Sequence, residues 1–330
     1  MVTIYDIAKK LGISTATVSR ALNGHDDVKT STKEKIVKTA NEMGYLPNSS
    51  ARSLTTKKSW NIGILFSDDM NSGLKHIFFA NVINEIIDSA AERGYDVSII
   101  SGNIGTEKTS YLRQAKYRLL DGIVIAAVDT THNDIQALIQ SDLPVALIDQ
   151  NFDDAICINS KNRKGIKSLV NHLYNKGYKK ITYVTGQLNN YIANDRLQAF
   201  KDITLEHRIN DSCNTIEGIF TDSTLAYEIT RNIMNSDNIP DAIMYSDDTA
   251  AIGGLKFLLE HDYKIPEDIA ICGYDGIEIS QLVTPKLTTV KQNIKEIGNK
   301  TANLLIDKIE GKEVKNTHWV GVELLPGETT

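Results

Sequence analysis

Apolar residues recur at helical spacing in three short groups over the first 44 residues. Gly12 ends the first group, Ser14 can cap a second helix, and Thr30 or Ser31 can cap a third. Positions three and four residues apart lie on one face of a helix, so each group predicts a short helix with one buried side. The apolar positions are Ile4, Ile7, Ala8 and Leu11, then Val18, Ala21 and Leu22, then Ile36, Val37, Ala40 and Met43.

From residue 61 onward, short apolar runs alternate with longer amphipathic stretches. Strands that are apolar along their length and alternate with helices are typical of buried parallel sheets joined by right-handed crossovers. We therefore expect a small all-α helix-turn-helix unit followed by a larger α/β body. The runs cover residues 62–66, 97–100, 123–127, 145–148, 181–184, 242–245 and 269–272, and helices are expected at 79–93, 164–176, 224–234 and 250–260.

The segment at 45–60 separates the two patterns and has the composition of a linker. It contains Pro47, several Ser and Thr, and the pair Lys57 and Lys58. One short helix is expected at 48–54, but about seven residues are too few for a helix to be stable alone in water. Such a segment can fold when a partner supports it. Leu54 on this polar linker suits a wedge that enters a minor-groove base step and kinks the duplex; the alternative is a packing contact with the body.

Charge is distributed unevenly along the chain. The net charge of −6 argues against nucleic-acid binding when taken alone, yet residues 1–58 hold ten Lys and Arg against five Asp and Glu. Residues 1–58 therefore have a net charge of +5 and the rest of the chain has a net charge of −11. This distribution is typical of a protein that binds phosphate groups through its N-terminal part. The 3 cysteines are scattered. Metal-ligand spacing, a cofactor motif, a secretion signal and a long apolar run are all missing, which fits a cytoplasmic protein without a cofactor or a membrane partner.

The first two expected helices have the pattern of a helix-turn-helix. That motif needs a small residue where the helices cross, a glycine in the turn and an apolar residue after it; Ala8, Gly12 and Ile13 meet these needs. The second helix would then present polar positions to base edges in a major groove, while its N-terminus would hold phosphates. A generic three-helix bundle with a solvated surface is the alternative. Candidate base readers are Thr15, Ala16, Ser19 and Arg20, and candidate phosphate contacts are Ser14 and Thr17.

The stretch from Thr3 to Leu54 closely resembles the headpiece of the LacI/GalR family of bacterial repressors. The resemblance implies a homodimer on a pseudo-palindromic operator, with two hinge helices in the central minor groove and Leu54 as the intercalating wedge. It also places Thr3, Asn23, Asn48 and Ala51 among the candidate DNA contacts. The matching pieces are Tyr5-Asp6-Ile7-Ala8, Gly12-Ile13-Ser14, Thr17-Val18-Ser19-Arg20-Ala21-Leu22-Asn23, Gly44-Tyr45-Leu46-Pro47-Asn48 and Ala51-Arg52-Ser53-Leu54.

Polar residues follow several of the apolar runs in the body, where parallel α/β lobes bind their ligands. Carboxylates and an arginine make charge-assisted hydrogen bonds to hydroxyl groups, and an aromatic ring can pack on the apolar face of a sugar. The pattern favours a polyhydroxylated ligand, although each aspartate could instead cap a helix or lie in a solvated loop. The residues are Ser67, Asp149, Arg196, Phe220, Asp247 beside Asp248, and Asp275.

The body resembles the same family more weakly, through residues 61–63, 121–123, 194–200, 273–275 and 285–290. The resemblance implies a periplasmic-binding-protein-like core of two lobes joined by three crossings of the chain. It divides the chain into a headpiece at 1–47, a hinge and linker at 48–60, and a core at 61–330 for effector binding and dimerisation. Lobe N then covers about 61–160 and 291–322, and lobe C about 161–290. By position, Arg196 and Asp275 are the strongest effector contacts, followed by Asp149, Asp247, Phe220, Ser67 and Phe79.

Three features depart from the family pattern. Asp247 stands where the family often has Asn, which puts its hydrogen-bonding role in question. The usual C-terminal Arg-x-Ser-Thr is replaced by Gly327-Glu328-Thr329-Thr330. The sequence stops there without the leucine-heptad tail that would make tetramers, so a dimer is favoured.

The leading hypothesis is a repressor of a carbohydrate-utilisation operon that leaves its operator when a small sugar binds between the lobes. A regulator with a phosphocarrier protein as co-effector is an alternative in the same class. An enzyme is disfavoured because the chain has no P-loop, nucleophile elbow, metalloprotease motif or dinucleotide fingerprint. A purely architectural DNA-binding protein is disfavoured because the large body has no basic surface of its own.

Overall fold

The computed structural model describes residues 2–22, 27–45, 58–66, 73–128, 130 and 132–330. The chain forms two compact units, Met1–Ser59 and Trp60–Thr330, which we call the headpiece and the core. The hinge expected at 48–54 lies outside the described residues. Among the described helices, none is both long and apolar enough to cross a bilayer.

The headpiece contains three helices, α1 (Ile4–Leu11), α2 (Thr15–Leu22) and α3 (Thr30–Glu42). Gly12 ends α1 in the left-handed region at φ 65°, and its N–H donates to the carbonyl of Ala8. The Ser14 hydroxyl accepts from the N–H of Thr17 at 3.1 Å, which confirms the expected cap of α2. The expected cap of α3 was wrong: Lys29 holds that position, without a side-chain bond, and Thr30 already belongs to the helix. The buried residues are Ile7, Ala8, Val18, Ala21, Ile36 and Ala40.

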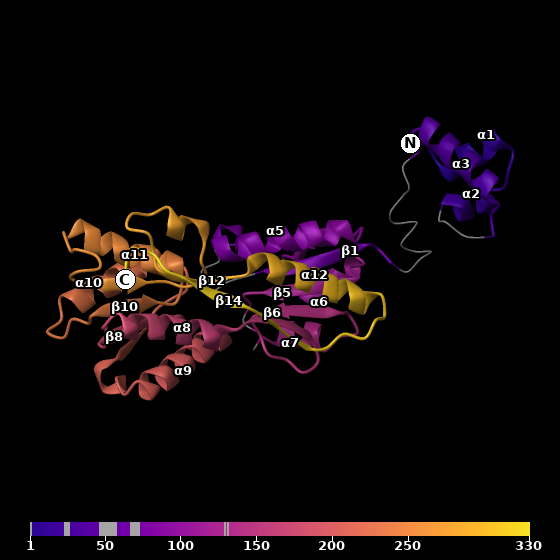
Figure 1. The fold of residues 1–330 in the computed structure, drawn as a ribbon. Helices are drawn as coiled ribbons and strands as arrows, with labels where there is room; N and C mark the ends of the chain where they lie inside the picture. Colours follow the sequence, from indigo (N-terminus) through magenta and orange to yellow (C-terminus); the bar gives the residue numbers. More distant parts are fainter. Residues whose placement is uncertain (1, 23–26, 46–57, 67–72, 129, 131) are drawn as a thin grey trace. The chain divides into compact units, whose positions relative to one another are not determined.

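The first lobe of the core, lobe N, is built on a parallel sheet of six strands in the order β13-β7-β6-β5-β1-β2. Helices α5 (Ile77–Glu92) and α12 (Ile294–Ile309) pack against one another over one face, as Figure 1 shows. Helices α6 (Tyr111–Tyr117) and α7 (Asn133–Ile139) belong to the opposite apolar cluster. The strands are β1 (Asn61–Phe66), β2 (Asp96–Ile99), β5 (Gly122–Ala126), β6 (Val145–Ile148), β7 (Ile156–Ser160) and β13 (Thr317–Val320). Shorter elements are η1 (Gly73–Lys75) and the hairpin of β3 (Asn103–Ile104) and β4 (Glu107–Lys108).

The second lobe, lobe C, repeats this plan on four parallel strands in the order β11-β10-β8-β9. One apolar cluster packs α8 (Asn162–Asn175) and α9 (Tyr191–Glu206) against the sheet. A second cluster packs α10 (Ser223–Met234) and α11 (Asp248–Glu260) against it. The strands are β8 (Ile181–Thr185), β9 (Asn214–Glu217), β10 (Ala242–Tyr245) and β11 (Ala270–Cys272), with short turns η2 (Asn210–Ser212) and η3 (Glu278–Gln281).

The chain passes between the lobes three times. The first passage joins β7 directly to α8 at Ser160–Asn162. The other two are β12 (Thr289–Gln292) and β14 (Val322–Leu325), which pair antiparallel with Thr289 opposite Leu325. This arrangement is the two-lobe α/β core with parallel sheets that the sequence predicts.

All seven apolar runs form strands, each within one residue of the expected bounds at either end. The remaining core strands were not expected from hydrophobicity. Strand β7 is buried at all five positions although it contains Asn159 and Ser160. Strands β9 and β13 lie at sheet edges, so they carry polar residues in place of a continuous apolar run.

Candidate functional sites

Helix α2 presents a polar face at the surface of the headpiece. Ala16 and Arg20 lie one turn apart on this helix and are exposed, whereas Thr15, Thr17 and Ser19 are half-buried. The Arg20 guanidinium lies 3.1 Å from the carboxylate of Asp27, and both side chains are more than half exposed. An exposed pair of this kind contributes little to stability, so the arginine can exchange its partner for DNA at small cost.

Three expected DNA contacts, Thr3, Ser14 and Thr17, also hold the local structure together. The Thr3 hydroxyl and N–H both donate to the Asp6 carboxylate at 2.8 Å, and these bonds lower the pKa of Asp6. The Ser14 and Thr17 hydroxyls lie 2.8 Å apart at the N-terminus of α2. Both N-termini are therefore ordered in the way that a phosphate-binding helix end requires. The other expected DNA contacts, at Asn23, Asn48, Ala51 and Leu54, lie outside the described residues.

A cleft between the two lobes gathers polar and aromatic side chains. One group of its residues lies at or just after the carboxyl ends of the parallel strands β5, β6, β8, β9 and β11. The others lie on α5 and α9, at the N-termini of these helices, or on β12. Five expected effector contacts meet there: Phe79, Asp149, Arg196, Phe220 and Asp275. Ser67 lies outside the described residues. The full lining is His76, Phe78, Phe79, Ala127, Ile148, Asp149, Gln150, Gln187, Asn190, Ile192, Arg196, Phe220, Thr221, Asp275 and Gln292.

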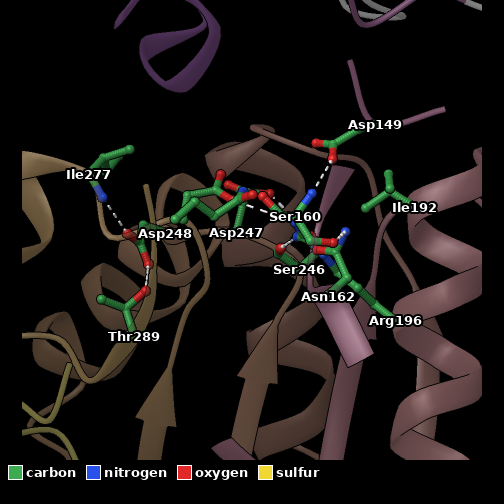
Figure 2. A network of polar contacts seen from close by, with 12 residues as sticks. Asp149, Ser160, Asn162, Ile192, Arg196, Ser246, Asp247, Asp248, Ile277 and Thr289 are labelled. Atoms are coloured by element: carbon green, nitrogen blue, oxygen red, sulfur yellow. Dashed lines mark hydrogen bonds and ion pairs between the residues drawn. The ribbon is translucent and has the colours of Figure 1, made fainter. Parts of the chain in front are cut away.

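Arg196 is buried at the centre of the cleft wall, with 2 % of its surface exposed. Its Nε donates to Asn162 and its Nη1 to the carbonyl of Ser246, both at 2.8 Å (Figure 2). The guanidinium also lies 3.7 Å from the centre of the Tyr274 ring. These contacts fix the plane of the guanidinium and leave Nη2 near Asp275, 3.8 Å from that carboxylate.

Two buried carboxylates share the cleft with this single arginine. Burial raises the pKa of Asp149, and it raises the pKa of Asp275 well above its ordinary value, although the Arg196 charge opposes both shifts. Asp275 accepts from the Gln292 amide at 2.7 Å, and Asp149 accepts from the N–H of Ser160 at 3.3 Å. Among the described residues, the buried amide oxygen of Gln292 has no hydrogen-bond partner, and it is available to a ligand donor.

Four residues of the cleft have positive φ angles without being glycine. The angles are 54° at Ala127, 56° at Asp149, 60° at Thr221 and 107° at Asp275. Side chains with a Cβ rarely adopt this region, and residues held there gather at functional sites. The surrounding sheet ends therefore impose an unusual backbone where the polar groups must converge.

Aromatic rings form the apolar part of the lining. The Phe220 ring packs on Gly186, where an added Cβ would lie 2.2 Å from the ring, and it lies 5.9 Å from the Arg196 guanidinium. On the opposite lobe, the Phe79 ring makes edge-to-face contacts with His76 and Phe78. The distances between ring centres are 4.9 Å to His76 and 5.2 Å to Phe78. The cleft thus offers aromatic surface from both lobes to the apolar face of a ligand.

Asp247 is not among the residues that line the cleft. Its carboxylate accepts from the N–H groups of Ala250 and Thr221, each at 2.9 Å, and from the Ser246 hydroxyl at 3.1 Å. It therefore caps α11 and holds the backbone beside Phe220, which is the N-cap alternative weighed for such aspartates.

Several lining residues were missed from the sequence. Gln150 and Gln187 directly follow the loop starts after β6 and β8, so the strand-end rule that selected Asp149 would also have found them. Asn190 caps α9 with its side chain and Thr221 follows Phe220, so both are extensions of expected positions. Gln292 lies on the passage strand β12, and no apolar run marks that strand in the sequence.

Comparison with known proteins agrees with both units. Residues 3–48 match the family described as bacterial regulatory proteins, lacI family, and residues 170–330 match a periplasmic binding protein-like domain. The chain is 30% identical to the ribose operon repressor of Halalkalibacterium halodurans, over 100% of this chain and 97% of that protein. It is 31% identical to the transcriptional repressor PurR of Vibrio atlanticus, over 95% of this chain and 93% of that protein.

A solved structure of the lac repressor dimer, bound to operator and the anti-inducer ONPF, has the same fold. It superposes with a TM-score of 0.86 at 26% identity, covering 99% of this chain and 98% of that one. A helix-turn-helix joined to a two-lobe binding core defines a ligand-responsive transcription regulator. The chain belongs to the lacI family of bacterial regulatory proteins and is a DNA-binding transcriptional repressor.

Proposed function

We propose that this repressor controls a carbohydrate-utilisation operon and leaves its operator when a small, uncharged sugar binds between the lobes. The observation that carries the proposal is the composition of the cleft, where two carboxylates, one arginine, four side-chain amides and several aromatic rings face one space. Carboxylates and amides suit the many hydroxyl groups of a sugar, and the rings suit its C–H faces.

The charges in the cleft favour a ligand without phosphate or carboxylate. Among the described lining residues, Arg196 is the one lysine or arginine, and Asn162, Ser246 and Tyr274 already occupy most of its guanidinium. Asp149 and Asp275 add no positive charge that could bind a phosphate or carboxylate. The related ribose operon repressor supports a pentose or another monosaccharide as the effector.

Release of DNA would follow from contacts that the sugar makes with both lobes. A ligand changes an equilibrium only through its different affinities for two arrangements. Phe79 and Asp149 belong to lobe N and Arg196 and Phe220 to lobe C, so a bound sugar favours the lobe arrangement that brings these groups together. In a homodimer, as in the lac repressor structure, that movement would separate paired hinges at 48–60 and withdraw Leu54 from the operator.

The roles of the described headpiece residues belong to the same proposal. Thr15, Ala16, Ser19 and Arg20 would read a pseudo-palindromic operator, while Thr3, Ser14 and Thr17 would hold phosphates. A phosphocarrier protein as co-effector finds no support in the described residues or in the family matches, and we do not propose it.

A thermal-shift screen of the full-length protein tests the effector class, because a ligand that binds only the native state raises its melting temperature. The panel should pair neutral pentoses and hexoses with their phosphates and uronic acids. Fluorescence anisotropy with an operator selected by the protein then measures release. We expect one neutral sugar to stabilise the protein and weaken operator binding; stabilisation by the charged partner alone, or operator affinity that no binding sugar changes, would refute the proposal.

A further inference from the structure

Asp248, the first residue of α11, joins two separate segments of the core through its carboxylate. Its side chain is buried, with 1 % of the residue exposed. Oδ2 accepts from the N–H of Ile277 at 2.9 Å, and Oδ1 accepts from the hydroxyl of Thr289 (Figure 2). Capping of α11 is performed by Asp247, whose carboxylate bonds Ala250. Asp248 therefore has no capping task, and its partners lie elsewhere in the sequence.

Both partners of Asp248 lead into lobe N. Thr289 is the first residue of β12, one of the three passages between the lobes. Ile277 lies in the loop after β11, but its side chain packs in the main apolar cluster of lobe N, with residues such as Ile297 and Phe79. A carboxylate at the N-terminus of a lobe C helix thus holds a strand that continues into lobe N and a loop whose Ile277 side chain packs there.

The same two segments carry ligand-facing residues of the cleft. Asp275 comes two residues before Ile277, and Gln292 comes three residues after Thr289. The segments are joined directly, because the N–H of Asp275 donates to Val290 at 2.9 Å and the N–H of Gln292 donates to Asp275 at 3.1 Å. A ligand that displaces Asp275 or Gln292 therefore also displaces the loop at Ile277 and strand β12, the two segments that Asp248 holds.

We infer that Asp248 is the positioning residue that couples occupation of the cleft to the orientation of lobe N. The inference rests on the proposed function, since it names the device by which the bound sugar would act. With its carboxylate in place, Ile277 and β12 move as one body with Asp275 and Gln292. Without it, a sugar still binds, but the displacement is absorbed within the loop at 273–277 instead of reaching lobe N.

The protonation state of Asp248 gives this coupling a recognisable pH profile. Among the described residues, the titratable groups coupled to it are Asp247, Asp275 and Cys272. Burial raises the pKa of Asp248 to about 7, while the Thr289 and Ile277 bonds lower it. The ionised carboxylate accepts from both donors, whereas the protonated acid gives up one acceptor. Coupling should therefore weaken as the pH falls through neutrality.

The test compares full-length wild type with Asp248→Asn, Thr289→Val and Asp241→Asn. Asp241 is the matched control, because its exposed carboxylate also accepts two N–H groups, from Lys179 and Lys180 at 2.8 and 2.9 Å, but within lobe C alone. D-ribose serves as the first probe. Calorimetry measures ribose affinity, and anisotropy measures operator affinity with and without saturating ribose from about pH 6 to about pH 8.

We expect Asp248→Asn to keep ribose affinity within about twofold but to reduce the ribose-dependent change in operator affinity by roughly fivefold or more, without pH dependence. Thr289→Val keeps the shape of the side chain but removes the hydroxyl. Its pH profile should have a higher midpoint, because the lost hydrogen bond lowers the pKa of Asp248. Asp241→Asn should behave as wild type. Undiminished coupling in Asp248→Asn would overturn the inference.

Hydrogen exchange on the sugar-free proteins separates this inference from the proposed function. Peptides that cover residues 273–283 and 289–292 should exchange faster in Asp248→Asn than in wild type, because the Ile277 N–H loses its charged acceptor. Exchange unchanged in these peptides overturns the anchoring role even if no sugar is found. A wild type that binds no sugar of the panel refutes the proposed function, while the exchange result still decides the role of Asp248.

Discussion

At the residue scale, a substitution of Arg20 distinguishes recognition of base edges from general attraction to phosphate. Its side chain extends from the exposed face of α2 and pairs with Asp27 across open surface. We expect Arg20→Ala to weaken operator binding by about 1–3 kcal/mol and to relax base preference at one position of each half-site. Binding to a library of mutated operators measures both effects. Equal weakening on all sequences would identify Arg20 as a phosphate contact, and Asp27→Asn provides the control for loss of the ion pair.

Arg196 provides the corresponding test in the cleft. Arg196→Lys keeps a positive charge but cannot reproduce the paired bonds to Asn162 and Ser246 or the stacking on Tyr274. We expect sugar affinity to fall by about 1.5–3 kcal/mol, the range for hydrogen bonds to charged groups. Calorimetry measures the change, with Arg163→Lys as control because Arg163 is half-exposed and pairs with Asp195 and Asp202. Equal sugar affinity in the two variants would contradict a direct role for Arg196.

At the element scale, the loop after β8 determines where Phe220 lies. Gly186→Ala places a methyl group where the Phe220 ring now packs, and a rigid ring cannot yield without leaving the cleft wall. We expect weaker sugar binding with unchanged operator affinity in the absence of sugar. Gly321→Ala is the control, because nothing lies within 4 Å of a Cβ built there. Retained sugar affinity in Gly186→Ala would show that Phe220 does not contact the ligand.

The hinge element at 48–54 carries its own prediction, made from the sequence. Leu54→Ala should reduce the bend of the operator and weaken binding while half-site preference stays intact, because a minor-groove wedge reads deformability and not base edges. Circular-permutation gel shifts measure the bend. Leu205→Ala, at a side chain 64% exposed on α9, controls for loss of an apolar surface group. An unchanged bend would indicate that Leu54 packs against the body instead.

The elements also show which parts of the fold could be predicted. Strands that are apolar throughout, such as β5 and β10, are buried on both faces and can be recognised from the sequence alone. Strands β12 and β14 cannot be recognised in this way, because their pairing joins residues 30 or more positions apart and no local pattern encodes it. The same reason explains the site: Asp149 and Asp275 follow recognisable strands, whereas Gln292 enters the cleft on a passage strand.

Residue type and position in the sequence also leave the roles of two neighbouring aspartates open, and the structure distinguishes them. Asp247 and Asp248 are adjacent and identical in type, yet one caps α11 and supports Thr221 while the other reaches Ile277 and Thr289. A sequence cannot distinguish these roles, because they depend on which distant backbone groups arrive beside each carboxylate.

At the scale of the whole molecule, the buried carboxylates make stability depend on pH. The pKa of Asp248 is raised to about 7, so the native state holds a proton that the unfolded chain releases above pH 4. Stability from this group is therefore present at low pH and is lost as the pH rises toward 7. We expect Asp248→Asn to flatten the fall in unfolding free energy between about pH 5 and about pH 7.5, measured by urea titration. A slope identical to wild type would contradict the raised pKa.

The unusual backbone at Asp149, Thr221 and Asp275 has a consequence for the design of biosensors from this scaffold. Left-handed φ angles tolerate Asn, Asp and Gly far better than bulky or β-branched residues, so libraries at these three positions would consist mostly of misfolded variants. Phe79, Gln187 and Ile192 line the same cleft without a positive φ angle and can be varied more freely. Evolution toward new effectors should follow the same route, retaining the polar anchors and exchanging the side chains around them.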